Sequence, residues 1–374
     1  MSKLKLMTII GTRPEIIRLS EIIAKCDVAF NHILVHTGQN WDYTLNDIFF
    51  KDFSLRQPDY YLNSVGSNLG ETIGNIIHLS YELMLKEKPD ALLLLGDTNS
   101  ALSAISAKRL KIPIFHMEAG NRCFDENVPE EINRRIVDHI SDINLPYSEH
   151  ARRNLIAEGI RKEYIFVTGS PLTELVHKYL PIIKQSNILS ELQLIENNYI
   201  LVSLHREENV DHPKHFSSLI DALNTVADTY QLPIIFSTHP RTQKKIASSN
   251  IKLCPLIQNI APLGYIDYNK LQLNAFCVLS DSGSLAEEAC LLRFPAVSIR
   301  TSTERPETID KGGMIMGNIT GDTVINSINV ARLLINSPDF SPPLDYVDAN
   351  ISSKIISIIQ GYTPIINQYI WHKD

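Results

Sequence analysis

Apolar and polar positions follow a repeating pattern in the first half of the chain. Apolar runs short enough to be buried strands occupy residues 6–10, 32–36, 91–96, 113–117 and 143–147. Helical spacing, with apolar positions recurring every three or four residues, lies between them at 13–26, 71–88 and 100–110. Because the apolar runs have no polar face, they predict a parallel sheet covered by helices on both sides.

The same pattern starts again in the second half. Strands are predicted at 199–205, 233–239, 275–280 and 295–300, and helices at 214–230 and 285–292. Two such halves predict an α/β protein with two doubly wound, Rossmann-like domains. The alternation is lost within 168–196, which places the seam there. The predicted divisions are a first domain at 1–172, a second at 173–350 and a C-terminal segment at 351–374.

The C-terminal segment has helical character that we expect to be broken at Gly361 and Pro364. We predict that this segment crosses back to the first domain. A length of 374 residues is enough for two domains with cores of their own. A hydrophobic content of 44% with 21% charged residues indicates an ordinary globular chain rather than a disordered one.

Charge and targeting signals narrow the range of partners. The net charge is −7 and no block of Lys and Arg stands out, so neither nucleic acid nor an anionic membrane is an expected partner. The N-terminus reads as a strand rather than a signal peptide, and no run of 18 apolar residues exists, which predicts a cytoplasmic protein.

The five cysteines have no CxxC spacing and are expected to be reduced; Cys123, in a polar loop, is the one candidate for reactivity.

Polar motifs follow the predicted strands at their carboxyl ends, where ligands bind in open α/β sheets. They are GTRPE at 11–15, GDTNS at 96–100, EAGNR at 118–122, HREEN at 205–209 and THPRT at 238–242. A central cleft between the two domains is expected to collect them. The first strand is not followed by GxGxxG, which disfavours a tightly held NAD, and the chain lacks a Walker A sequence.

A small-residue turn at 281–284, DSGS, joins the strand at 275–280 to the next helix. Free backbone N–H groups and the helix dipole make such a helix start an anion site. The hydroxyls of Ser282 and Ser284 can cap the helix or contact a phosphate, and Gly283 lets a bulky anion approach the backbone. The turn therefore predicts a site for the diphosphate of a nucleotide sugar.

Arginines at or near strand ends supply positive charge for the same ligand. They are Arg13, Arg18, Arg241 and Arg305. Arginine fits phosphate oxygens by two parallel hydrogen bonds. The alternative for any one of them is an ion pair with a nearby glutamate, but four such placements together favour an anion site.

Carboxylates that follow buried strands form the second candidate group. Asp97 and Glu118 each stand directly after an apolar run, where a charge is costly unless it serves a site or is paired. Glu130 and Glu131 follow Pro129, and for them the alternative is stabilisation of a helix dipole by acidic residues in its first turn.

Three histidines are candidates for proton transfer or for metal binding. His205 stands at a strand end, where it can donate to a phosphate or transfer a proton, although a structural role is the alternative. His116 lies inside an apolar run and is expected to belong to the core, and His239 is a weaker candidate. Their spacing does not indicate a metal site.

The motifs together resemble the UDP-N-acetylglucosamine 2-epimerase family over nearly the whole chain and in the same order. The matching segments are GTRPE (11–15), TGQN (37–40), GDT (96–98), EAGNR (118–122), PEEINRR (129–135), SEHARRNL (148–155), TGSP (168–171), HREEN (205–209), DSGSLAEEA (281–289) and TERPE (303–307). The resemblance implies a glycosyltransferase-B architecture, a UDP-sugar substrate, a homodimer and no cofactor or metal.

The resemblance also implies roles for particular residues. The acid/base carboxylates are matched by Asp97, Glu118 and Glu130, and the histidine near the leaving diphosphate by His205. Diphosphate contacts are matched by Arg13, Ser282, Gly283 and Ser284, the ribose-binding carboxylate by Glu288, and the arginine behind the site by Arg305. Two departures are Arg18, where the main family has lysine, and Leu263, where many members have glutamine.

Within the family, residues 121–144 and 203–211 resemble the capsule and O-antigen branch. That branch converts UDP-2-acetamido-2,6-dideoxy-L-talose to UDP-N-acetyl-L-fucosamine. The loop between Arg122 and Pro129 is shorter than in the glucosamine enzymes, which fits a 6-deoxy hexose. Alternatives are a UDP-N-acetylglucosamine 2-epimerase, a glycosyltransferase of the same architecture, and an inactive sensor of nucleotide sugars.

Overall fold

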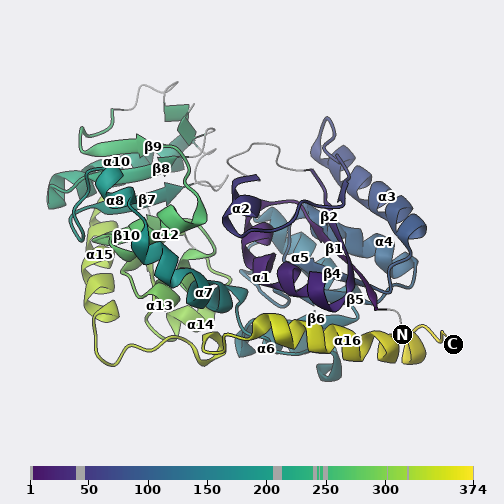
Figure 1. The fold of residues 1–374 in the computed structure, drawn as a ribbon. Coiled ribbons are helices and arrows are strands. Elements are labelled where there is room, and N and C mark those ends of the chain that lie inside the picture. Colours follow the sequence, from purple (N-terminus) through teal and green to yellow (C-terminus); the bar gives the residue numbers. More distant parts are fainter. Residues whose placement is uncertain are drawn as a thin grey trace. The chain divides into compact units, whose positions relative to one another are not determined.

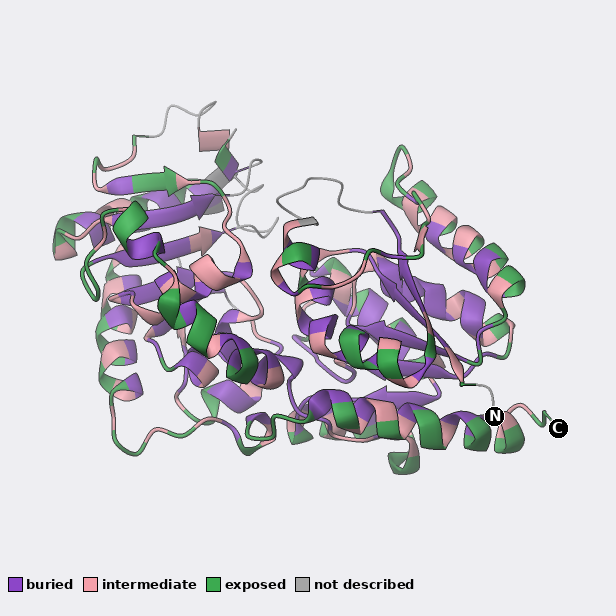
Figure 2. Cartoon of the chain, viewed as in Figure 1, coloured by how far each residue is buried: buried purple, intermediate pink, exposed green. Residues whose placement is uncertain are grey.

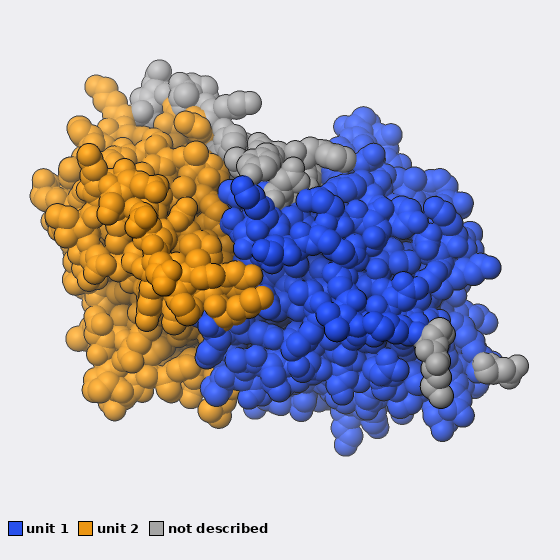
Figure 3. Space-filling view, viewed as in Figure 1, with its two compact units in different colours: residues 1–177, 345–374 blue, residues 178–344 orange. Residues whose placement is uncertain are grey.

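The computed structural model describes residues 3–38, 47–204, 213–238, 242–243, 245–246, 252–300, 302–317 and 320–373. They form two compact units, which Figure 3 shows in different colours. Unit 1 comprises Met1–His177 and Asp345–Asp374, and unit 2 comprises Lys178–Leu344. The C-terminal segment therefore belongs to the same unit as the N-terminus.

Unit 1 is built on a six-stranded parallel sheet with the strand order β3-β2-β1-β4-β5-β6 (Figure 1). Its strands are β1 (Lys5–Ile10), β2 (Asn31–His36), β3 (Tyr60–Tyr61), β4 (Ala91–Leu95), β5 (Ile114–Met117) and β6 (Ile143–Leu145). The structure confirms the five strands predicted for this half. The edge strand β3 was not predicted, because it has only two residues and no apolar run.

Helices cover this sheet. They are α1 (Arg13–Ala29), α2 (Asp47–Asp52), α3 (Leu69–Glu87), α4 (Ala104–Arg109), α5 (Pro129–Ile140), α6 (Glu149–Ala157) and α16 (Ile351–Tyr369), with short 3-10 helices at Asn99–Ser103 and Lys162–Tyr164. The helix α7 (Pro171–Gln185) begins in unit 1 and ends in unit 2. Local sequence explains several helix starts. Pro14 lies in the first turn of α1, and the side chains of Asn68 and Ser148 accept hydrogen bonds from the first turns of α3 and α6.

Unit 2 repeats the arrangement, with the strand order β12-β11-β10-β7-β8-β9 and every pair parallel. Its strands are β7 (Ile200–Leu204), β8 (Ile234–Thr238), β9 (Ile257–Ile260), β10 (Cys277–Ser280), β11 (Ala296–Ile299) and β12 (Ile315–Gly317). Its helices are α8 (Ile188–Glu191), α10 (Pro213–Tyr230), α12 (Tyr265–Leu273), α13 (Leu285–Leu292), α14 (Pro306–Ile309) and α15 (Gly321–Ile335). A 3-10 helix at Leu344–Tyr346 begins at the last residue of unit 2 and continues into unit 1.

The fold is therefore α/β with two doubly wound, Rossmann-like units, as predicted. In each sheet the strand order reverses between the first and fourth strands of that unit, which are β1 and β4 in unit 1 and β7 and β10 in unit 2. Ligands of such sheets bind beyond the carboxyl ends of strands at this switch point. Figure 2 shows the interior strands, such as β4 and β8, buried beneath the helices, as their unbroken apolar runs require.

The C-terminal segment differs from its prediction. It is one continuous helix, α16, with Pro364 inside it, rather than a helix broken at Gly361 and Pro364. A proline removes one backbone hydrogen bond, but a buried face of Ile355, Ile359 and Ile366 holds the helix against α1. Both interrupting residues lie on the exposed side. No helix among the described residues is long and apolar enough to cross a membrane.

Candidate active site

Three loops at the carboxyl end of the unit 1 sheet carry the predicted chemistry. The loop after β1 leads into α1 through Arg13, the loop after β4 holds Asp97, and the loop after β5 holds Glu118. The first turn of α5 adds Glu130. Since β1 and β4 flank the switch point and β5 adjoins β4, the topology brings these loops to one edge of the sheet.

Glu118 is held by donors on one side of this site. Arg18 Nη1 lies 3.7 Å from its Oε2, the Tyr147 hydroxyl donates to Oε2 at 3.4 Å, and Asn121 Nδ2 donates to Oε1 at 3.2 Å. The Arg18 guanidinium also lies over the Tyr147 ring, 5.7 Å from its centroid. Arg18, predicted as a phosphate ligand, thus contacts a candidate acid/base carboxylate from the interior of α1.

The backbone of Glu118 is strained. Its φ is +62°, in the left-handed region that residues other than glycine seldom adopt. Strain of this kind is costly and gathers where surrounding structure holds a functional group in place. The loop after β4 lies beside this carboxylate, because a Cβ on Gly96 would be in van der Waals contact with Glu118 Oε2 at 3.5 Å.

Asp97 is bound by an arginine that the sequence reasoning did not single out. Arg134 in α5 donates to Asp97 Oδ2 from Nη2 at 2.6 Å and from Nε at 3.0 Å, and to Glu131 from Nη1 at 2.9 Å. Its guanidinium is almost fully buried. The signal was present in the helical spacing, because Arg134 stands three residues after Glu131 and therefore on the same face of the helix.

The two glutamates at the start of α5 have different surroundings. Glu131 is 1% exposed and accepts hydrogen bonds from Arg134, Arg135 and the backbone N–H of Cys123. Burial acts to raise the pKa of Glu131, but the Cys123 hydrogen bonds and the charge of Arg134 hold it below its usual range. Glu130 is half-buried and forms no hydrogen bond or ion pair with the described residues. Glu130 is thus the carboxylate of this pair that is available to a substrate.

Glu15, the last residue of GTRPE, was also missed as a functional candidate. Its Oε2 accepts from the Gly11 backbone N–H at 3.1 Å and from the Thr12 hydroxyl at 2.7 Å. Burial raises the pKa of Glu15 to about 7. The Thr98 hydroxyl lies beside this carboxyl and lowers its pKa slightly, although it makes no well-aligned hydrogen bond with the described residues. Glu15 therefore links the loops after β1 and β4.

The serine-rich turn of unit 2 follows β10, again at a switch point. The hydroxyls of Ser282 and Ser284 are 3.0 Å apart, and Ser280 Oγ accepts from the Ser282 backbone N–H at 3.1 Å. Ser284 occupies the N-cap position of α13, but its side chain forms no capping hydrogen bond. The Ser282 hydroxyl instead accepts from the Ser284 backbone N–H at 3.4 Å at the start of the helix, and Ser282, Gly283 and Ser284 are partly exposed.

Behind this turn, α13 is anchored by buried polar contacts. Arg305 Nε donates to Glu287 Oε2 at 3.0 Å, and both side chains are almost fully buried. Glu288 Oε2 accepts from Gln272 Nε2 at 2.7 Å. Arg305, predicted as a phosphate ligand, thus contributes to positioning the helix that begins at the turn. Its contact with a phosphate stays a prediction, as does the ribose contact of Glu288.

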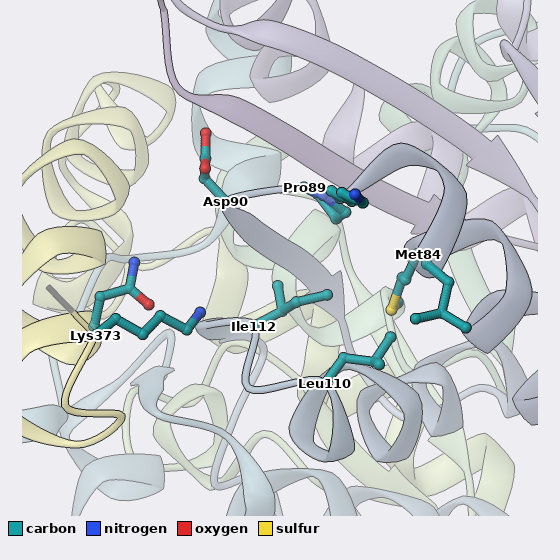
Figure 4. Close-up of a pocket in the computed structure, with 9 residues that line it drawn as sticks. Met84, Pro89, Asp90, Leu110, Ile112 and Lys373 are labelled. Atoms are coloured by element: carbon teal, nitrogen blue, oxygen red, sulfur yellow. The ribbon is translucent and has the colours of Figure 1, made fainter.

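Two predicted residues, His205 and Arg241, lie outside the described residues. Within the part of the chain that the structure describes, no group of three His, Cys, Asp or Glu side chains is arranged to hold a metal ion. Figure 4 shows a cavity of about 350 Å³ in unit 1. Asp90 and Ile112, which precede β4 and β5, line it, so it lies at the amino ends of the strands and away from the predicted site.

Two doubly wound units, one with a carboxylate cluster and one with a serine-glycine turn at its switch point, define an α/β enzyme of the nucleotide-sugar type. A model of the UDP-N-acetylglucosamine 2-epimerase family matches residues 24–360. The chain belongs to this family. It is therefore an isomerase, a UDP-sugar 2-epimerase, as the sequence predicted.

Solved structures and curated relatives agree. A UDP-N-acetylglucosamine 2-epimerase from Rickettsia bellii is 45% identical, with a TM-score of 0.92 over 99% of this chain and 100% of that one. The Methanocaldococcus jannaschii enzyme, solved with UDP-GlcNAc and UDP, is 35% identical, with a TM-score of 0.89 over 96% and 100%. A UDP-2,3-diacetamido-2,3-dideoxy-D-glucuronate 2-epimerase from Pseudomonas aeruginosa is 33% identical over 87% and 91%.

Proposed function

We propose that the chain inverts C2 of UDP-2-acetamido-2,6-dideoxy-L-talose to give UDP-N-acetyl-L-fucosamine. The observation that carries the 2-epimerase chemistry is the carboxylate cluster at the switch point of unit 1. Asp97, Glu118 and Glu130 reach that edge from three separate elements, and Arg134 and Arg18 lie beside the first two. Carboxylates gathered in this way are costly unless they are paired or serve a site, and this cluster lies where open α/β sheets bind their ligands.

The proposed reaction proceeds by elimination and re-addition of UDP. The C2 hydrogen is not next to a carbonyl, so it becomes acidic only as the C1–O bond breaks and positive charge grows at C1. UDP leaves with the bonding pair, a carboxylate takes the C2 proton, and a 2-acetamidoglycal forms. Reprotonation of C2 on the opposite face and return of UDP to C1 complete the inversion.

The diphosphate must be stabilised as it leaves and must be retained for its return. The Ser282–Ser284 turn offers hydroxyls and helix N–H groups, and Arg13 begins α1 next to the β1 loop. The sequence resemblance adds His205 to the diphosphate site and Glu288 to the ribose site, and the place of Arg241 after a predicted strand adds it as a further phosphate ligand. A solved relative from M. jannaschii, bound to UDP-GlcNAc and UDP, supports a UDP-sugar as the ligand.

The choice of sugar rests on residues 121–144 and 203–211. In the structure, the short loop after Arg122 is tied back to α5, because the backbone N–H of Cys123 donates to Glu131. The curated relatives are named for more than one sugar, so family membership leaves the substrate open. UDP-N-acetylglucosamine is the alternative substrate. Supply of capsule or O-antigen precursors by a cytoplasmic homodimer remains part of this proposal.

Incubation with UDP-sugars in deuterated water tests both the 2-epimerase reaction and the choice of sugar. With UDP-2-acetamido-2,6-dideoxy-L-talose we expect NMR to show deuterium at C2 and net inversion of that carbon. With UDP-N-acetylglucosamine we expect a kcat/KM at least about tenfold lower. Preference for the glucosamine sugar would overturn the substrate assignment and leave the epimerase intact. UDP release that requires an acceptor, without deuterium at C2, would instead indicate a glycosyltransferase.

A further inference from the structure

A buried carboxylate, Asp138 in α5, connects two of the catalytic loops of unit 1. Its Oδ1 lies 2.9 Å from His116 Nδ1, and its Oδ2 accepts from Arg122 Nη1 at 2.7 Å. The backbone N–H of Gly120 donates to both carboxylate oxygens, at 3.2 and 3.1 Å. Asp138 and His116 have fully buried side chains. The acid/base chemistry proposed above uses neither of them.

His116 extends this connection to the loop after β4. Its Nε2 lies 2.7 Å from the carbonyl oxygen of Gly96. A carbonyl oxygen only accepts, so the ring donates from Nε2. Burial acts to raise the pKa of Asp138, but the hydrogen bond and charge of His116 and the charge of Arg122 hold it below its usual range. His116 is buried in the core, as its apolar run predicted, and its two ring nitrogens contact Asp138 and the loop after β4.

The two peptide groups held in this way flank the candidate acid/base residues. The Gly96 carbonyl belongs to the peptide bond that enters Asp97, and the Gly120 N–H lies two residues after Glu118. Gly96, Glu118 and Gly120 all have left-handed backbones, with φ of +70°, +62° and +78°. Glycine adopts this region readily but glutamate does not, so the backbone of Glu118 needs outside contacts to stay in this conformation.

Asp138 also has a fixed counter-charge. Arg122 binds it and forms two hydrogen bonds with Glu158, from Nε to Oε1 at 2.8 Å and from Nη2 to Oε2 at 2.6 Å. Buried ion pairs often stabilise a fold no better than well-packed apolar side chains do. A fully buried network that ends on two loop peptides therefore fits a role in placing those loops.

We propose that Asp138 and His116 are positioning residues that set the spacing of Asp97 and Glu118. This inference rests on the 2-epimerase function proposed above. A displacement of about 1 Å at a reacting group can reduce a rate by about a hundredfold without weakening substrate binding. Loss of the network is thus expected to lower kcat rather than raise KM.

Two substitutions of His116 separate positioning from general stability. In His116→Gln the amide nitrogen takes the place of Nε2 and can still donate to Gly96. In His116→Asn it takes the place of Nδ1, keeping the bond to Asp138 and losing the one to Gly96. We expect His116→Asn to lower kcat by about 10- to 100-fold with KM within about threefold, and His116→Gln to recover most of that loss.

A matched control exists in the same sheet. His32 in β2 is 1% exposed at its side chain and lies 2.6 Å from Asp27, with its other nitrogen 2.9 Å from Thr8. His32→Asn is therefore expected to keep the contact with Asp27 and lose the one with Thr8, which matches the change in His116→Asn at a place that does not contact the catalytic loops. We expect a lower Tm and a kcat within about twofold of the wild type. If kcat falls in proportion to Tm in His116→Asn, His116→Gln and His32→Asn alike, the positioning role is wrong.

Hydrogen exchange of the loop amides tests the inference without any substrate. We expect the peptides that cover residues 96–98 and 118–121 to exchange at least about tenfold faster in His116→Asn than in the wild type, and to stay protected in His116→Gln. Unchanged exchange in His116→Asn would overturn the inference even if the enzyme is an active epimerase. Faster exchange in a protein that epimerises no UDP-sugar would uphold it and reject the proposed function.

Discussion

Glu130 and Glu131 are neighbours in sequence with opposite surroundings, and this contrast yields a test at the residue scale. Glu130→Gln removes a half-buried carboxylate that contacts no other described side chain through a hydrogen bond. We expect kcat to fall by about 10² to 10⁴, the usual contribution of an acid or base, with Tm unchanged. Kinetics of C2 deuterium exchange, together with thermal unfolding, measure both quantities.

Glu131→Gln is the control for that experiment. It weakens the bonds to Arg134 and Arg135 and leaves buried positive charge poorly compensated. We expect a loss of about 2 kcal/mol in the free energy of unfolding. A large drop in stability for Glu130→Gln, or none for Glu131→Gln, would reverse the roles assigned to the two carboxylates.

Glu15 provides a pH-dependent prediction. Its pKa is raised by burial from 4.5 to about 7 in the folded protein. The folded state therefore binds the proton more tightly than the unfolded state does. The stabilising contribution is complete below pH 4.5 and is lost as the pH rises through 7. Between pH 5.5 and pH 8 the wild type should lose about 2 kcal/mol relative to Glu15→Gln.

Urea unfolding of both proteins at the two pH values measures this difference directly. The amide of Glu15→Gln does not titrate, so its own pH dependence reports all other groups and serves as the reference. A difference between the two proteins that stays constant from pH 5.5 to pH 8 would show that Glu15 is not held in its protonated form by burial.

The sequence placed Asp97 and Glu118 at strand ends because each follows an apolar run directly. It did not place Arg134 against Asp97, since that contact depends on how α5 packs beside the loop after β4. It missed Glu15 for a related reason. A glutamate in the first turn of a helix is ordinary, and only the tertiary structure shows that this one is buried.

At the scale of elements, the central strands were predictable, whereas three of the four edge strands, β3, β9 and β12, were not. Central strands are apolar on both faces, so they stand out as unbroken runs. The edge strands β3 and β12 have only two and three residues, and β9 exposes Gln258 and Asn259, so neither length nor pattern marks them. The helix α7 was hidden in the presumed seam because Pro181 interrupts its pattern.

The helix α16 shows how tertiary packing overrides a local rule. Glycine and proline both disfavour a helix interior, which supported a break at Gly361 and Pro364. In the structure, Thr363 donates its hydroxyl to the carbonyl of Ile359, and the buried face continues past the proline to Ile366. The penalty of the two residues is outweighed because their side of the helix faces solvent and the other side is fully buried.

At the scale of the whole molecule, the two units have the same strand order, and each switch point carries a different group of candidate site residues. The carboxylates lie beside the β1–β4 switch point, and the serine turn lies at the β7–β10 switch point. The chain order of the motifs was sufficient to predict this division, because a parallel sheet directs all its strand ends to one edge. The return of the chain to unit 1 through α16 depends on packing and has no comparable motif.

Unit 1 is discontinuous in sequence, which predicts an asymmetric response to truncation. Removing residues 345–374 takes away α16, whose residues Ile351, Ile355, Ile359 and Ile366 are fully buried. Each buried isoleucine contributes about 2 kcal/mol, so the four together rival the whole stability of a typical domain. We expect unit 1 to lose its cooperative unfolding transition.

Unit 2 lies within residues 178–344 and keeps all its strands in this truncation, so its transition should persist. Differential scanning calorimetry separates the two transitions, and hydrogen exchange assigns each to its unit. The control removes only residues 370–374, which leaves the buried face of α16 intact and should shift the transition of unit 1 slightly. If the longer truncation leaves both transitions in place, then α16 is an appendage and unit 1 is complete at residue 177. If both transitions disappear, the two units are one cooperative body, because unit 2 would then depend on contacts that lie outside its own sequence.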